Sequence, residues 1–229
     1  MRKDLTGKVL GVIHAGTWVA ATGKRFADEI IPEVTLLHIC DDTLQRDFML
    51  AGAGNIPPFN YLRVALYARF LEESGANAIM LGCSTMNRAA EYAQPMVRVP
   101  FLQIDWPMMQ KAVQLGKRIG LLATLDTTVP SSTRLLRKAA SEAGTEIEIT
   151  ELFSSEAYNA LRSGQQEKHD QILLRIVREN QHQVDAIVLA QISMAALEPK
   201  VNAAHFAIPV LNSAREGFIR AREVLEGLP

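Results

Sequence analysis

The sequence is built from two similar stretches that lie 108 to 109 residues apart. The matching segments are short, apolar and in the same order in both stretches. They pair Gly7–Ile13 with Gly116–Leu122, Ala78–Cys83 with Ala186–Gln191, and Val99–Leu102 with Ile208–Leu211. Three matches at one spacing predict two halves of the same fold. We expect residues 1–104 to form the first half and 105–212 the second, with 213–229 as a helix that packs back on the first half.

Each half alternates apolar runs with helical patterns, which is typical of a parallel sheet covered on both faces. Lys8–His14 and Val34–Ile39 are such runs. We therefore predict an α/β fold of two halves, each a parallel sheet of about four strands flanked by helices. A pseudo-dyad would relate the halves and place a cleft between them. Residues 41–58 are interpreted as a loop that covers the cleft, followed by a helix with Leu62, Leu66 and Phe70 on one stripe.

Ligands of open parallel sheets bind beyond the carboxyl ends of the strands, so the residues at those ends are the candidates for a site. In this sequence they are mostly small and polar, with one thiol among them. The candidates are His14, Thr17, Asp42, Cys83, Ser84, Thr85, Thr124, Gln191 and Ser193. The hydroxyl and amide groups would hold a small carboxylate.

Composition excludes several other classes of function. The formal net charge is −1, whereas a nucleic-acid binder usually carries a basic excess. No apolar segment is long enough for a membrane span or a secretory signal, so we expect a cytoplasmic protein without a membrane partner. Two cysteines make no zinc-type spacing, and the scattered histidines predict no metal. A basic helix stripe at 134–138 is consistent with subunit contacts, and we expect a homo-oligomer.

Cys83 is the sharpest candidate because it ends an apolar strand and precedes Ser84 and Thr85, either of which would cap a helix. A sulfur at a helix N-terminus meets free backbone N–H groups that favour the thiolate. Cys83 would therefore act as an acid or base at carbon. His14, at the end of the first strand, has a pKa suited to proton transfer and is a possible second acid or base.

The segments Leu81–Thr85 and Gly120–Thr124, together with the repeat, resemble the aspartate/glutamate/hydantoin racemase superfamily over the whole chain. The resemblance implies an isomerase that works without pyridoxal phosphate or another cofactor. In that superfamily two cysteines, one from each half, face each other across the substrate's α-carbon. One removes the proton, and the other returns it to the opposite face.

The sequence departs from this pattern at Gln191, which occupies the position of the second cysteine. A glutamine amide is neither a general acid nor a general base near neutral pH. We therefore predict a one-cysteine variant that transfers a proton at the carbon α to a carboxylate of a small amino acid or related carbon acid. The alternatives are a one-thiol decarboxylase of a malonate-like diacid and a non-catalytic protein that binds a small carboxylate.

Overall fold

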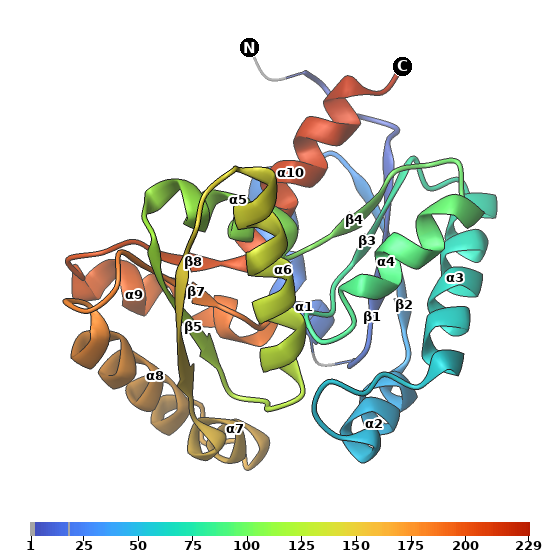
Figure 1. Ribbon diagram of the computed structural model, residues 1–229. Coiled ribbons are helices and arrows are strands. Elements are labelled where there is room, and N and C mark those ends of the chain that lie inside the picture. The colour runs from blue at the N-terminus through green and yellow to red at the C-terminus, as the bar shows by residue number, and fades with distance from the viewer. Residues whose placement is uncertain (1–2, 18) are drawn as a thin grey trace.

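The computed structural model describes residues 3–17 and 19–229 and contains two four-stranded parallel sheets (Figure 1). The first sheet has the order β2-β1-β3-β4, with bounds Val9–His14 for β1, Thr35–Cys40 for β2, Ala78–Leu81 for β3 and Phe101–Gln103 for β4. The second has the order β6-β5-β7-β8, with bounds Arg118–Ala123 for β5, Glu148–Phe153 for β6, Ala186–Leu189 for β7 and Val210–Asn212 for β8. The predicted α/β fold of two halves is confirmed.

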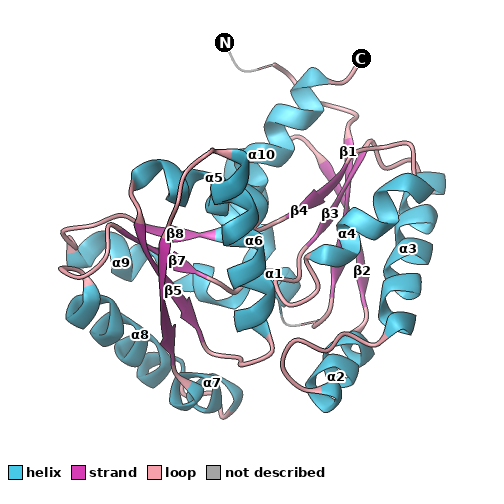
Figure 2. Cartoon of the chain, in the orientation of Figure 1, coloured by secondary structure: helices cyan, strands magenta, loops and turns pink. Residues whose placement is uncertain are grey.

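Helices lie on both faces of each sheet (Figure 2). In the first half and its connection they are α1 (Val19–Ile30), α2 (Asp42–Ala51), α3 (Pro58–Glu73), α4 (Arg88–Ala93), the 3-10 turn η1 (Gln94–Met96) and α5 (Trp106–Leu115). The second half adds α6 (Thr128–Glu142), α7 (Ser155–Arg162), α8 (Gln166–Asn180), the 3-10 turn η2 (Ile192–Leu197), α9 (Glu198–Ala204) and α10 (Ser213–Gly227).

The two sheets repeat each other in register as well as in order. Gly11 pairs with Ile79 in the first sheet, and Gly120 pairs with Ile187 in the second. Both glycines are needed for close packing, because a Cβ at Gly11 would lie 2.9 Å from Leu71 Cδ1 and one at Gly120 would lie 2.9 Å from Ile187 Cγ1. The two halves therefore share the same strand pairing, and in both a glycine of the central strand leaves room for a neighbouring side chain.

Successive residues of β1 point to opposite faces of the first sheet and build two separate cores. Leu10 and Val12 pack with α1 and α10, whereas Ile13 packs with α3 and α4. The chain crosses back at its end, because Phe218 of α10 lies in the same core as Leu10. Ile192 of η2 joins this core as well, so the second half contributes directly to the packing of the first.

Two local predictions in the segment before β3 are wrong. Residues 42–51 form α2 rather than loop, because Asp41 accepts a hydrogen bond from the backbone N–H of Thr43 and thereby caps a helix whose Leu44 and Phe48 are buried. On α3 the buried face includes Val64 and Ala68 instead of the predicted stripe.

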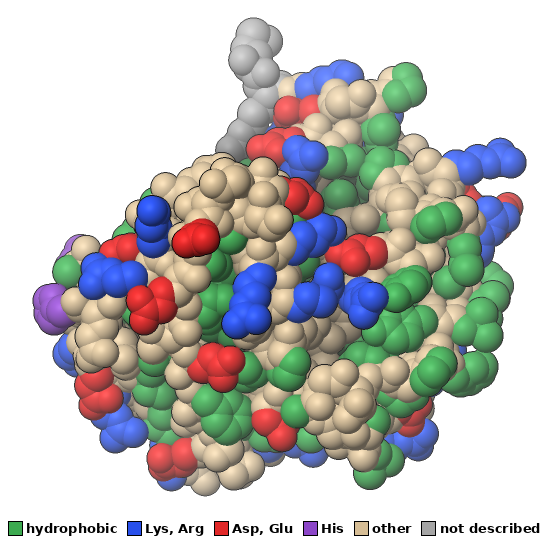
Figure 3. Space-filling view, viewed as in Figure 1, with side chains coloured by type: hydrophobic (Ala, Val, Ile, Leu, Met, Phe, Trp, Pro, Cys, Tyr) green, Lys and Arg blue, Asp and Glu red, His purple; other side chains and the backbone are tan. Residues whose placement is uncertain are grey.

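The predicted stripe on α3 is part of an exposed apolar surface. Its members are Phe59, Leu62, Leu66 and Phe70, each between 45% and 63% exposed. Hydrophobic side chains accordingly gather over α3 at the right of the molecule (Figure 3). Within residues 3–17 and 19–229, no helix is long and apolar enough to cross a membrane.

Candidate active site

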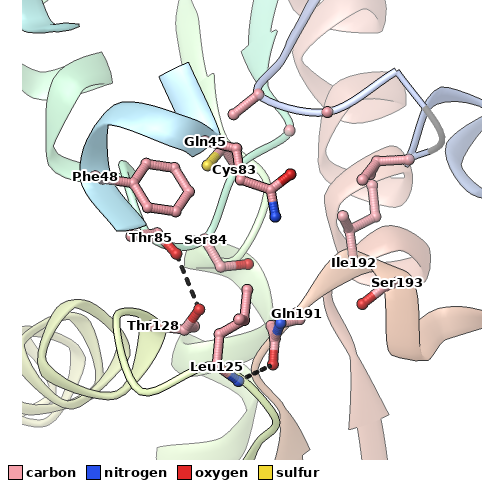
Figure 4. A pocket seen from close by; sticks show the side chains of 14 residues that line it. Gln45, Phe48, Cys83, Ser84, Thr85, Leu125, Thr128, Gln191, Ile192 and Ser193 are labelled. Atoms are coloured by element: carbon pink, nitrogen blue, oxygen red, sulfur yellow. Dashed lines mark hydrogen bonds between the residues drawn. The ribbon is translucent and has the colours of Figure 1, made fainter. Parts of the chain in front are cut away.

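A small cavity of about 50 Å³ lies between the two halves, at the carboxyl ends of β1, β3 and β7 (Figure 4). Both halves contribute to its walls, as the repeat predicts for a site at strand ends. Its lining consists of Ala15, Gly16, Val19, Gln45, Phe48, Gly82, Cys83, Ser84, Thr85, Leu125, Thr128, Gln191, Ile192 and Ser193. None of these described lining residues carries a formal charge at neutral pH. The chemistry available here is that of one thiol, several hydroxyls and two amides.

Cys83 lies two residues beyond the end of β3 and is 8% exposed. Burial raises the pKa of its thiol to about 12, although the backbone N–H groups of Met86 and Thr85 act in the opposite direction. The predicted stabilisation of the thiolate is therefore outweighed by desolvation of the buried sulfur. The predicted capping is also absent, since α4 begins only at Arg88. The resting thiol is neutral, with two N–H donors placed to stabilise a thiolate once it forms.

Gln191 faces the cavity from the second half, at the end of β7. Its Oε1 accepts hydrogen bonds from Thr124 N at 2.6 Å, Thr124 Oγ1 at 2.9 Å and Leu125 N at 3.2 Å. These three bonds orient the amide so that its nitrogen points toward the cavity (Figure 4). Gln191 thus offers an N–H donor on the wall opposite Cys83.

Ser84 connects the cavity to a buried carboxyl group that the strand-end analysis missed. Its Oγ donates to Asp105 Oδ1 at 2.9 Å, and Asp105 is 0% exposed, directly before α5. Burial raises the pKa of Asp105 to about 7, while hydrogen bonding from Ser84 and Ser213 lowers it. The sequence offered one signal for Asp105, namely its place after β4, at a strand end.

Thr85 and Thr128 close the cavity between the halves through a hydrogen bond of 2.9 Å between their hydroxyls. Two further walls come from α2, where Gln45 and Phe48 stand one helical turn apart. Sequence reasoning overlooked these two residues because their segment was interpreted as a loop. Ser193 lines the cavity at the start of η2, next to Gln191.

Four of the predicted site residues lie outside the cavity lining. Thr124 supports Gln191 from behind, as described above, and Thr17 and Asp42 line an outer hollow together with Gln45. His14 is 1% exposed and pairs with His38, with 3.0 Å between His14 Nε2 and His38 Nδ1. The structure therefore does not bring His14 to the cavity.

Burial and the neighbouring His38 lower the pKa of His14 to about 4. The ring is neutral at physiological pH and lies beside the backbone of Gly82, where a Cβ would come within 3.2 Å of His14 Nδ1. Among the described residues, no group of three His, Cys, Asp or Glu side chains is placed to hold a metal ion.

Comparison with known proteins places this chain in one family. The chain belongs to the Asp/Glu/Hydantoin racemase family, whose model matches residues 52–219. A comparison with curated proteins finds no match.

Solved structures of racemases are similar to this chain over nearly its whole length. The allantoin racemase from Klebsiella pneumoniae aligns with a TM-score of 0.69 and 18% identity, covering 96% of this chain and 87% of that one. The aspartate racemase of Picrophilus torridus aligns at 0.69 and 16%, covering 95% of each chain. The glutamate racemase from Thermus thermophilus in complex with β-chloro-D-alanine aligns at 0.71 and 20%, covering 98% and 82%. At these identities the likeness establishes the fold, and the substrate has to be argued from the cavity.

Proposed function

We propose that this chain is a cofactor-independent enzyme that transfers a proton at the carbon α to a carboxylate of a small carbon acid, with Cys83 as its single acid/base. The observation that carries the proposal is the pairing of Cys83 and Gln191. They occupy equivalent positions of the repeat and line one cavity from opposite halves. A substrate held between them has a thiol on one face and an uncharged amide on the other.

The neutral thiol suits the step in which a proton is delivered to carbon. Exchange starts when the thiol loses its proton to solvent and the thiolate removes the α-proton, so that the Cα–H bond breaks and the Sγ–H bond forms. After the Sγ proton exchanges with solvent, the thiol returns a proton to the same face of the carbanion, the C–H bond forms again and the thiolate is regenerated. The N–H groups of Thr85 and Met86 favour that thiolate, and it can remove the α-proton of the next substrate on the same face. Gln191 and Ser193 would donate hydrogen bonds to the oxygens of the enediolate, where negative charge develops.

The cavity also limits the substrate. The space open to water between these walls, about 50 Å³, is narrow, which favours a compact substrate. Phe48, Leu125 and Ile192 would contact an apolar substituent rather than a second charged group. These features favour a small acid with a short apolar side group.

The test is exchange of the α-proton in deuterium oxide, followed by NMR, for small amino acids, hydantoins and 2-substituted malonates. We expect exchange with retention of configuration, measured on a chiral column, and its loss in Cys83→Ala and Cys83→Ser. Racemisation at the rate of exchange would mean a second acid or base on the Gln191 face. Binding of these acids with no exchange for any of them would favour a non-catalytic binding protein.

A further inference from the structure

The buried carboxyl group of Asp105 has no role in the proton transfer proposed above. Its Oδ1 accepts from Ser84 Oγ at 2.9 Å, whereas within the described part of the chain its Oδ2 forms no hydrogen bond of regular geometry. The Ser213 hydroxyl, which also acts on this carboxyl group, is likewise buried without a bond of regular geometry. A buried carboxylate oxygen without a partner is costly, whereas a protonated carboxyl has a donor to offer. Asp105 is therefore poised to exist in either protonation state.

The state of Asp105 decides what Ser84 offers to the cavity. A serine hydroxyl has one donor and two acceptor sites. When Asp105 is ionised, the Ser84 proton is used in the bond to Oδ1, and only acceptor sites remain for the cavity. When Asp105 is protonated, its O–H can donate to Ser84 Oγ, and the Ser84 proton is free to point at a ligand.

We propose that Asp105 is a positioning residue that takes up a proton when a small carboxylate enters the cavity, and that it acts through Ser84, whose hydroxyl then becomes a donor to the ligand. The inference rests on the proposed function in requiring a carboxylate ligand at this site. A carboxylate is an acceptor only, so it needs donors from the wall. No described lining residue supplies a positive charge, and a second ionised carboxylate behind Ser84 would repel the ligand.

Few other groups act on Asp105. The titratable side chain beside it is Cys83, whose pKa the Asp105 charge raises, and the Ser213 hydroxyl faces it from α10. The charged side chains of α5 and α10 nearest in sequence are engaged in ion pairs of their own. These pairs are Lys111 with Glu216, and Arg215 with Glu29 and Glu198.

Isothermal titration calorimetry with propionate, in two buffers of different ionisation enthalpy, measures proton uptake directly. With the pKa of Asp105 near 7, we expect uptake approaching one proton per propionate at about pH 8.5 and little at about pH 6. The Kd for propionate should rise about tenfold per pH unit above pH 7. Propionamide, which carries no charge and has its own donor, should bind with a flat pH profile.

Two variants separate this role from a structural one. Asp105→Asn keeps the size and provides a fixed N–H donor to Ser84, so it should bind propionate with no proton uptake and a nearly constant Kd. Ser84→Ala removes both the donor and the link to Asp105, so it should lose about tenfold in affinity at about pH 6. The loss should be much smaller at about pH 8.5, because the parent must take up a proton to bind there. If Asp105→Asn does not fold, the Ser84→Ala and propionamide measurements test whether Asp105 acts through Ser84.

The proposal is overturned if the parent takes up no proton, if Asp105→Asn takes up as many protons as the parent, or if propionate does not bind at about pH 6. Proton-linked binding without any α-proton exchange would reject the proposed catalysis and leave the role of Asp105 intact. Exchange without proton-linked binding would reject only the role of Asp105.

Discussion

The hydroxyls of Thr85 and Thr128 lie 2.9 Å apart and join the first half of the molecule to the second at the wall of the cavity. Both residues are buried, with at most 5% of their surface exposed. The bond connects the turn after β3 to the first residue of α6. The same pair therefore forms part of the cavity wall and one of the contacts between the halves.

A double-mutant cycle on this pair should reveal the coupling. Thr85→Val and Thr128→Val should each destabilise the fold by about 1–3 kcal/mol, because each leaves the other hydroxyl buried without its partner. The double variant should be less destabilised than the sum, with a coupling energy of about 0.5–1.5 kcal/mol in urea unfolding. The control cycle combines Thr85→Val with Ser163→Ala, an exposed site with no shared partner, and should be additive. Additivity in the Thr85/Thr128 cycle would contradict the bond.

The Cys83 thiol should react slowly with iodoacetamide at neutral pH. Burial raises its pKa to about 12, so the thiolate fraction near pH 7.5 is roughly a thousandfold lower than that of a free cysteine. The rate, followed by mass spectrometry in a Cys40→Ser background, should rise about tenfold per pH unit up to at least pH 10. A fast reaction that stays constant below pH 8 would show a thiolate in the resting enzyme instead.

A cysteine at position 191 should supply the missing second acid/base. We expect Gln191→Cys to racemise a substrate that the parent only exchanges, because a thiol then faces each side of the α-carbon. Ser193→Cys is the matched control: it puts a thiol on the same wall, away from the repeat-equivalent position, and should not racemise. Equal racemisation by both variants would argue against the alignment of residue 191 with Cys83.

Truncation at the same position tests the support that Gln191 gives to its neighbours. Gln191→Ala removes the acceptor of the Thr124 and Leu125 backbone N–H groups. The cost should be about 1–3 kcal/mol in the free energy of unfolding, together with weaker ligand binding. Unchanged stability in thermal and urea unfolding would mean that water replaces the amide oxygen without loss.

The buried His14 should make the fold sensitive to mild acid. Its pKa falls from 6.5 to about 4 on folding, so between these values the unfolded chain binds more protons than the folded one. Stability contributed by the neutral ring is complete above pH 6.5 and is lost as the pH falls toward 4, by on the order of 3 kcal/mol. Urea unfolding of His14→Gln should lose this part of the pH slope, whereas the same change at exposed His182 should keep it. A parent slope retained in His14→Gln would assign the effect to another group.

The sequence alone determined the architecture, because its signals are local and periodic. Apolar runs such as Ala78–Leu81 have few structural alternatives to a buried parallel strand, and the repeat dictated that the second half would follow the first. The carboxyl ends of parallel strands meet at one edge of a sheet, and Cys83 and Gln191 occupy equivalent strand ends in the repeat. The sequence therefore also predicted that these two residues face each other. The racemase family followed from the same residues.

Tertiary structure alone decided the electrostatics and the local packing. The helix α2 forms because capping by Asp41 and the burial of Phe48 outweigh a loop-like composition. The N–H groups near Cys83 suggested a thiolate, yet burial raises the pKa of the thiol, because desolvation depends on every neighbour and not on the local motif. The same holds for Asp105 and His14: burial, and with it protonation state, is a property of the packed molecule that no short stretch of sequence contains.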